Sequence, residues 1–223
     1  MTNTTPRKVI FDTDPGVDDA MALYYALAHP GIEVVGITTT FGNVYVQQAV
    51  TNALYLCALA GRKIPVTQGA DKPLVKAVEM PPDFIHGQDG LGNLPHRVAT
   101  DSRPDPRGSA QFIVDTVRQF PGEITLVAVG PLGNLEAALR LAPELPTLVQ
   151  EVILMGGAVL ESGNVSPVAE ANIWNDPHAA DAVFTAGWPL TMVGLDVTHQ
   201  LVLPLALFRQ IAQFHDHRAT DCL

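Results

Sequence analysis

Apolar, β-branched runs alternate with segments of helical periodicity along almost the whole chain. A run such as EITLVAV at 123–129 predicts a strand, whereas apolar positions spaced three and four apart predict a helix. The predicted strands are residues 8–11, 32–40, 64–68, 123–129, 150–155 and 190–195. The predicted helices start at residue 17 and then cover 44–60, 109–120, 132–141, 177–186 and 205 to about 214.

This alternation indicates the fold class. Strands that alternate with helices form right-handed βαβ units, so we expect an α/β fold with a mainly parallel open sheet and helices on both faces. The strands are near-continuous apolar runs, as in sheets that are covered on both sides. No linker, repeat or low-complexity stretch interrupts the pattern, which predicts a single domain over residues 1–223.

Polar residues and two long loops follow the predicted strands. The loops are residues 70–107 and 158–176, and both leave from the carboxyl ends of strands. Ligands of open parallel sheets bind beyond those ends. Loops longer than about 12–15 residues in a compact domain are usually functional or disordered. The sequence therefore places its candidate chemistry at one edge of the sheet.

The first strand ends in a cluster of carboxylates. Asp12, Asp14, Asp18 and Asp19 fall within eight positions of the stretch KVIFDTDPGVDDA. Two like charges about 4 Å apart repel by roughly 4 kcal/mol at an effective dielectric of about 20, so some groups are protonated or a cation lies among them. Oxygen ligands without a Cys and His cluster select Ca²⁺ or Mg²⁺ over zinc. The alternative is two helix-capping aspartates and two exposed turn aspartates.

The two long loops carry further candidates. His86 lies among glycines in HGQDG, where the backbone can approach a ligand closely, although an exposed loop histidine is the alternative. The second loop carries Asn164, and then Glu170 and Asn172, which lie on one side if the segment is extended. Such groups suit hydroxyl recognition, as on a sugar, and ordinary turn chemistry is the alternative. We interpret His199 as structural rather than catalytic.

Composition excludes some classes of binding partner and indicates a cellular location. The net charge of −10 argues against nucleic acid, because phosphate binding needs clustered Lys and Arg. The polar N-terminus has no apolar signal core, and no segment has about 18 consecutive apolar residues, so we expect no membrane partner. The two cysteines, Cys57 and Cys222, suggest no disulfide framework, which favours a reducing, cytoplasmic location.

Several segments together resemble the inosine–uridine-preferring nucleoside hydrolases. They are DTDPGVDDA, ITTTFGN, HGQDG, VAVGPLGN, VILMGG, GNVSPVAEAN and MVGLDVTHQ, in the family's order and across residues 8 to about 204. The resemblance implies an α/β domain on a mainly parallel sheet. It also implies hydrolysis of the N-glycosidic bond of a ribonucleoside to ribose and free base, in a homodimer or homotetramer.

The resemblance also implies roles for individual residues. Asp14, Asp19 and the backbone carbonyl of Val129 would bind Ca²⁺, and Asp14 would take a proton from the Ca²⁺-bound water that attacks the anomeric carbon. The remaining roles are ribose hydroxyl binding by Asp18, Asn43, Glu170 and Asn172, a 5′-side position for Asn164, a base-facing position for His86, and shaping of the site by Asp12 and Met155. A carboxylate-rich pocket fits this chemistry, because glycoside cleavage passes through an oxocarbenium-like state.

The match fails near the C-terminus. The family has a further His-Asp pair there, and His215-Asp216 comes too early to be equivalent, so we expect a C-terminally truncated form that lacks part of the family's fold. A missing carboxylate would weaken Ca²⁺ binding, and lost general-acid assistance typically costs about 10²–10⁴-fold in rate, so we expect impaired activity. Smaller departures are Gly133, where Thr is common, and Ala171, where an aromatic residue is common.

Two other functions stay open at this point. One is a catalytically inactive homologue that binds ribose or nucleosides without turnover. The other is a phosphatase of the haloacid-dehalogenase type, because Asp12-Thr13-Asp14 after a strand resembles its nucleophile motif. That chemistry needs a downstream Lys near the phosphate, and no predicted strand ends in one.

Overall fold

The computed structural model describes residues 5–97, 99–211 and 213, and it contains one six-stranded sheet. The strand order is β3-β2-β1-β4-β5-β6, and every neighbouring pair is parallel. The predicted α/β class with a parallel open sheet is confirmed. The strands are β1 (Arg7–Thr13), β2 (Ile32–Thr39), β3 (Val66–Gln68), β4 (Ile124–Ala128), β5 (Glu151–Met155) and β6 (Leu190–Val193).

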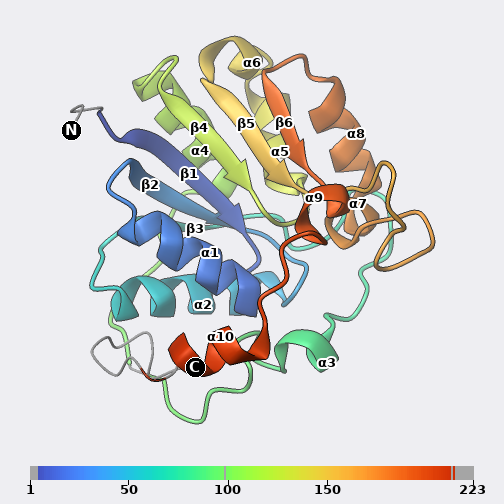
Figure 1. Ribbon diagram of the computed structural model, residues 1–223. Helices are drawn as coiled ribbons and strands as arrows, with labels where there is room; N and C mark the ends of the chain where they lie inside the picture. The colour runs from blue at the N-terminus through green and yellow to red at the C-terminus, as the bar shows by residue number, and fades with distance from the viewer. Residues whose placement is uncertain (1–4, 98, 212, 214–223) are drawn as a thin grey trace.

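Helices cover both faces of the sheet, as Figure 1 shows. On one face lie α1 (Val17–Ala28) and α2 (Val46–Leu59). On the other face lie α4 (Ser109–Gln119), α5 (Gly133–Leu141), α6 (Leu145–Leu148) and α8 (Pro177–Thr185). The two layers explain why the strands are apolar along their whole length, since successive side chains point to opposite faces.

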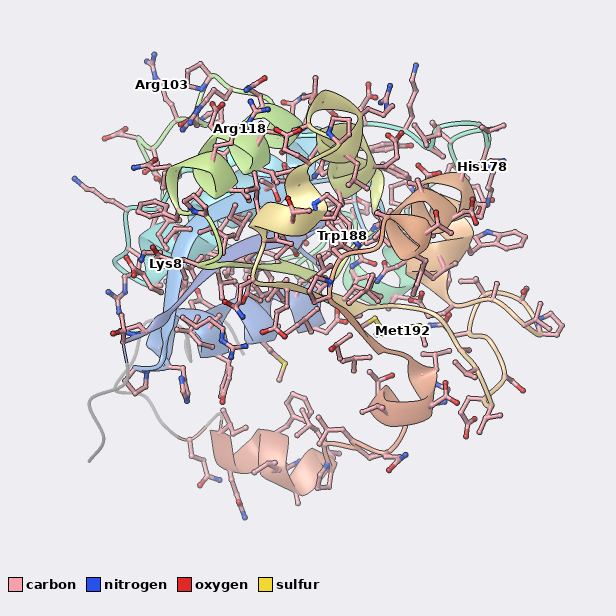
Figure 2. The ribbon with its side chains drawn as sticks, turned by 90° about the horizontal axis from the view of Figure 1, so that it is seen from above. Lys8, Arg103, Arg118, His178, Trp188 and Met192 are labelled. Atoms are coloured by element: carbon pink, nitrogen blue, oxygen red, sulfur yellow. The ribbon has the colours of Figure 1, made fainter. Side chains whose placement is uncertain are left out.

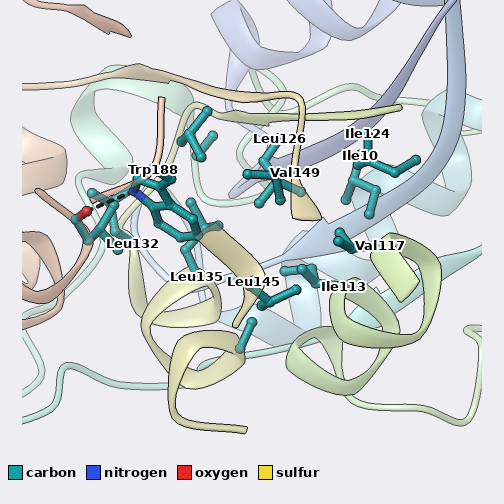
Figure 3. Packing of buried hydrophobic residues seen from close by; sticks show 14 of the residues in the cluster. Ile10, Ile113, Val117, Ile124, Leu126, Leu132, Leu135, Leu145, Val149 and Trp188 are labelled. Carbon is teal, nitrogen blue, oxygen red and sulfur yellow. Dashed lines mark hydrogen bonds between the residues drawn. The ribbon is translucent and has the colours of Figure 1, made fainter. Parts of the chain in front are cut away.

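Strand β1 illustrates this division of the core. Val9 and Phe11 pack with α1 and α2, whereas Ile10 between them packs with α4 and α5. Figure 3 shows the second of these layers, with Trp188 at one end of it. The Trp188 side chain is buried and donates a hydrogen bond from Nε1 to the Val183 carbonyl at 2.8 Å.

Four short helices lie where the sequence predicted loops or a strand end. They are α3 (Asp83–His86), α6, α7 (Ala171–Asn175) and α9 (Leu195–Thr198). The extended geometry considered for Glu170 and Asn172 is wrong, because Glu170 caps α7 and Asn172 lies inside that helix. Four- or five-residue helices carry too little periodicity to be recognised in a sequence. The last helix, α10, is Leu205–Ile211, and the rest of its predicted range is not fully described.

The strands point their carboxyl ends toward the side of the molecule where α7 and α9 lie (Figure 1). Lys8, near the amino end of β1, and Met192, near the carboxyl end of β6, accordingly appear on opposite sides of the view in Figure 2. Within the described ranges, no helix combines the length and apolar character needed to span a bilayer.

Candidate functional site

The acidic turn, residues 12–19, joins β1 to α1. Strand β1 ends at Thr13, Pro15 and Gly16 turn the chain, and α1 begins at Val17. Asp19 stabilises this helix start, because its Oδ2 accepts a hydrogen bond from the Gly16 N–H at 3.0 Å. Asp18 points outward, with 81% of its side chain exposed. The turn therefore separates one exposed carboxylate from three buried ones.

Asp14 is buried beside two glycines. Its Oδ2 accepts a hydrogen bond from the Asn43 backbone N–H at 2.6 Å, whereas its Oδ1 has no donor among the described residues. A Cβ atom on Gly42 would lie 2.0 Å from Oδ2, and one on Gly130 would lie 2.6 Å from Oδ1. Side chains at these two positions would displace the carboxylate, so the glycines make room for it.

Asp19 lies next to Asp14 and is held by three donors. Besides the Gly16 N–H, its carboxylate accepts from Thr13 Oγ1 at 2.7 Å and from Asn43 Nδ2 at 2.9 Å. Asn43 thus contacts both carboxylates, through its backbone to Asp14 and through its side chain to Asp19. The predicted trio of Asp14, Asp19 and Asn43 is brought together at the end of β1 and β2.

Asp12 lies one pleat behind Asp14 and is held by neutral donors. Its Oδ2 accepts from Thr38 Oγ1 at 2.5 Å and from Asn134 Nδ2 at 2.7 Å, and its Oδ1 is buried without a partner in the described structure. Thr38 is its register partner on β2. Asn134, on α5, also donates to the Thr39 carbonyl and accepts from the Ala70 N–H.

Burial dominates the electrostatics of this cluster. It raises the pKa of Asp12 to about 7 and, with repulsion from Asp18, that of Asp19 to about 6. It also raises the pKa of Asp14 well above the usual range, and the charge of Asp19 adds to this. No Lys or Arg of the described part of the chain forms an ion pair with these three groups. Negative charge on these three groups therefore has no cationic side chain to compensate it in the described part of the chain.

A second group of predicted residues gathers at the ends of β4 and β5. Asn172 Nδ2 lies 2.9 Å from the Val129 carbonyl oxygen, 3.0 Å from the Met155 carbonyl oxygen and 3.5 Å from the Met155 sulfur. Because Gly130 follows Val129 and abuts Asp14, this group adjoins the acidic turn. Asn172 links the two strand ends and lies beside the carboxylate cluster.

Glu170 and Asn164 organise the second loop. The Glu170 carboxylate, 2% exposed, accepts from the N–H groups of Asn172, Ile173 and Gly157 at 2.9–3.2 Å. Asn164 Oδ1 accepts from the Ala171 N–H at 2.9 Å, and Asn164 is otherwise exposed. Much of the acceptor capacity predicted for hydroxyl binding is thus used to shape the loop.

His86 closes the other side of the turn. Its Nδ1 lies 3.4 Å from the Val17 N–H and 3.8 Å from Asp18 Oδ1. Burial lowers the pKa of the imidazole, and the charge of Asp18 opposes this. A Cβ atom on Gly16 would lie 2.8 Å from Nδ1, so the ring packs directly on the turn. When Nδ1 accepts the hydrogen bond of the Val17 N–H, the neutral imidazole carries its own proton on Nε2.

A cavity of about 440 Å³ lies between the first loop, the second loop and the turn that carries Asn43, and Asn43 is the one predicted site residue that lines it. Lys76, Glu79 and Trp174 also line it and form a clamp between the two loops. Lys76 Nζ lies 4.0 Å from the centre of the Trp174 ring and donates to the Trp174 carbonyl, while Glu79 accepts from Trp174 Nε1 at 3.2 Å. The two long loops are therefore joined at the cavity wall.

The donors available to a metal ion are oxygens. In the described residues, no group of three or more His, Cys, Asp or Glu side chains is arranged to hold a metal. The two buried carboxylates of Asp14 and Asp19 nevertheless lie together, and one oxygen of Asp14 has no partner. The Val129 carbonyl lies nearby and already accepts one hydrogen bond. Hard oxygen donors with uncompensated negative charge fit Ca²⁺ better than a softer metal.

Two polar residues of the cluster, Thr38 and Asn134, were missed by the sequence analysis. Thr38 and Asn134 hold Asp12, and Thr40 has a buried hydroxyl without a partner among the described groups. The run ITTT carried a signal, because Thr38 and Thr40 share one side of a strand that ends at the ligand edge. Asp196 binds the N–H groups of Val159 and Leu160, and His215-Asp216 lie outside the described residues.

Comparisons with known proteins agree with this arrangement. Residues 9–222 match the family described as inosine-uridine preferring nucleoside hydrolase. A probable uridine nucleosidase 2 of Arabidopsis thaliana is 47% identical over 199 residues, which are 88% of this chain and 62% of that protein. An inosine-uridine preferring nucleoside hydrolase of Leishmania major is 42% identical over 210 residues, 93% of this chain and 66% of that protein.

Solved structures give the same result. A plant nucleoside hydrolase superposes with a TM-score of 0.90 at 41% identity, covering 97% of this chain and 68% of that one. A purine-preferring ribonucleoside hydrolase from Gardnerella vaginalis gives 0.89 at 40% identity, covering 92% and 66%. The chain spans 59–62% of the length of the plant uridine nucleosidases that it matches. It belongs to the inosine-uridine preferring nucleoside hydrolase family.

Proposed function

We propose that this chain binds ribonucleosides and hydrolyses their N-glycosidic bond to ribose and free base. The observation that supports this most is the buried Asp14 carboxylate with one unpartnered oxygen, beside a second buried carboxylate and without a cationic side chain. Such a group has no structural explanation, because an unsatisfied buried carboxylate costs stability. Its expected occupant is a reactant or an ion.

Asp14 is our candidate for the general base. In the absence of a cation, burial and the charge of Asp19 raise the pKa of Asp14, which makes its carboxylate a better proton acceptor near neutral pH than an ordinary aspartate. The Asn43 N–H fixes one carboxylate oxygen, so the other is left free to accept a proton from the attacking water. The neighbouring carboxylates would stabilise the positive charge that develops on the sugar in the transition state.

Asp14, Asp19 and the Val129 carbonyl are the proposed Ca²⁺ ligands. When bound, Ca²⁺ would neutralise the cluster, orient a water molecule and lower its pKa. Asn43 would hold both carboxylates in place through the two hydrogen bonds described above. Asn172 would keep the Val129 carbonyl oriented.

The remaining residues are proposed to bind the nucleoside. The exposed Asp18 carboxylate and the Asn43 and Asn172 amides border the cluster and suit ribose hydroxyls. Glu170 and Asn164 would act on the sugar from the second loop, mostly by shaping it. His86, with its proton on Nε2, would face the base, and Met155 would line the site.

The test is hydrolysis of uridine and inosine with added Ca²⁺, measured as reducing sugar. We expect ribose release that falls when Ca²⁺ is chelated, and that is lost in Asp14→Asn. Asp105→Asn, on a partly buried carboxylate of the first loop, is the matched control and should keep the wild-type rate. No ribose release from this chain, or from a form extended beyond Leu223, would contradict the proposal.

A second candidate is a protein that binds ribose or nucleosides without turnover. It is favoured by one observation, namely that the described residues bring only two carboxylates to the candidate metal site. Calorimetry with ribose and with Ca²⁺ separates the two candidates. Binding without product over many hours would support the second and exclude the first. A dimeric or tetrameric assembly and a cytoplasmic location stay predictions.

A further inference from the structure

Asn52 occupies a buried position between two parts of the site. It lies on α2, is completely buried, and uses its whole hydrogen-bonding capacity. Its Nδ2 donates to the Pro15 carbonyl at 3.0 Å and to the Asp89 carbonyl at 2.9 Å. Its Oδ1 accepts from Gln48 at 2.8 Å and from Arg97 at 2.7 Å. One side chain therefore joins the acidic turn to the loop that follows His86.

Asp89 organises that loop from within. Its Oδ1 accepts from the N–H groups of Leu91 and Asn93 at 2.9 and 2.8 Å. Its Oδ2 accepts from the Leu94 N–H at 3.1 Å and from Arg97 at 2.7 Å. Because Arg97 contacts both Asp89 and Asn52, the loop closes on α2 as well as on itself.

His86 is attached to the same unit. The Gly92 N–H donates to the His86 carbonyl at 2.8 Å. Gly90 has a positive φ of 79°, and a Cβ atom there would lie 2.5 Å from Val44 and 3.1 Å from the Pro15 carbonyl. The loop therefore packs against the acidic turn at a distance that only glycine permits.

We propose that Asn52, Asp89 and Arg97 are positioning residues that hold the acidic turn and the His86 loop in one fixed relation. Pro15 lies between the proposed metal ligands Asp14 and Asp19, so the same link sets the carboxylates on one side and the imidazole on the other. A nucleoside that contacts both the acidic turn and His86 would bind well only when these two segments keep this relative position. This last step rests on the proposed function, whereas the link between the two segments does not.

Hydrogen–deuterium exchange tests the link without reference to activity. Arg97→Gln removes the charged donor shared by Asp89 and Asn52, and we expect amide exchange to rise about tenfold in segments 84–96 and 12–20 together. Arg97→Lys keeps the charge but loses the fork, so its exchange should be intermediate. It also serves as the second variant if Arg97→Gln does not fold. Unchanged exchange in segment 12–20 in both variants would overturn the proposal.

Arg107→Gln is the matched control. Like Arg97, Arg107 is hydrogen-bonded to an aspartate, Asp105, and lies over an aromatic ring, that of Phe112. We expect it to raise exchange only around its own loop. If both variants raised exchange of segment 12–20 equally, the effect would be general destabilisation and the proposal would be wrong.

Uridine kinetics test the functional half. Arg97→Gln should raise KM about tenfold with a smaller change in kcat, whereas Arg107→Gln should leave both within about twofold. Equal kinetics of the two variants would refute a positioning role in ligand binding. If the wild-type chain hydrolyses no nucleoside, the proposed function fails, and the exchange measurement still decides whether the two segments are linked.

Discussion

Two sets of aspartates in this molecule have opposite partners and opposite pKa shifts. In the first long loop, Asp105 and Asp89 each bind an arginine. The Arg107 guanidinium lowers the pKa of Asp105 to about 2, and although burial opposes ionisation of Asp89, Arg97 and two backbone N–H groups lower its pKa too. In the acidic turn, Asp12, Asp14 and Asp19 are more deeply buried, bind only neutral donors, and have raised pKa values.

The difference separates structural from reactive carboxylates. A carboxylate that serves the fold is paired, and pairing stabilises its charged form. A buried carboxylate that has neither a cationic partner nor a donor for one of its oxygens, as in Asp14, is expensive, so its persistence indicates a ligand that supplies the missing positive charge. The predictions below test this contrast, starting with the largest expected effect.

The sharpest test compares Asp14→Asn with Asp105→Asn in the uridine assay. Both changes neutralise a carboxylate at almost constant size. Asp14→Asn removes the proposed base, for which losses of about 10²–10⁴-fold in rate are typical, and Asp105→Asn should leave the rate unchanged. Similar losses of rate in both variants would mean that Asp14 has no catalytic role beyond that of an ordinary structural carboxylate.

Asp12→Asn should change how stability depends on pH. The folded pKa of Asp12, about 7, lies above the ordinary value of 3.8, so the folded chain binds more protons than the unfolded chain between these values. Stability is therefore lost as pH rises through that window, by up to about 4 kcal/mol at about 1.4 kcal/mol per pKa unit. Urea unfolding at pH 5 and pH 8 should show a smaller loss in Asp12→Asn. An unchanged slope would mean that Asp12 is not protonated in the folded chain.

Calcium should stabilise the protein more at pH 8 than at pH 5. The raised pKa values of Asp14 and Asp19 mean that Ca²⁺ must displace protons at low pH, whereas fewer protons remain to be displaced at pH 8, so Ca²⁺ binds more tightly there. A hundredfold excess over Kd gives about 2.7 kcal/mol of stabilisation. Thermal unfolding with Ca²⁺ or with EDTA measures it. Equal shifts at the two pH values would argue that these carboxylates do not bind the ion, and Asp14→Asn should reduce the shift.

The smallest effect is expected from Asp105→Asn on stability. The pair with Arg107 lies at the surface with both side chains partly exposed, and ion pairs at the surface contribute about 0–1 kcal/mol. Its contribution should be present above the unfolded pKa of Asp and lost as pH falls toward about 2. Urea unfolding at neutral pH should detect less than about 1 kcal/mol. A loss of several kcal/mol would contradict the small contribution expected for this pair.

The sequence predicted the sheet and the neighbourhood of Asp14, Asp19 and Asn43, because near-continuous apolar runs and the edge rule for parallel sheets need no tertiary detail. It did not predict that Asn172 joins β4 to β5 or that Glu170 caps a helix, since α7 is too short to leave a periodic signal. Asn134 and Thr38 were missed for another reason. Thr38 reaches their common partner, Asp12, through the pairing of β1 with β2. Asn134 reaches it from α5, which is distant from Asp12 in the sequence. Positioning contacts of this kind depend on the fold, not on the local pattern.

The clamp of Lys76 and Glu79 around Trp174 also gives the molecule an internal optical reporter. The chain has two tryptophans, and Trp188 is sealed in the core while Trp174 is 39% exposed at the junction of the two long loops. Separation of the loops would hydrate the Trp174 indole and remove its ammonium neighbour, so its emission would move to longer wavelength. Trp188 would supply a constant blue background, and a Trp188-containing Trp174→Phe variant would show which part of the signal belongs to the junction.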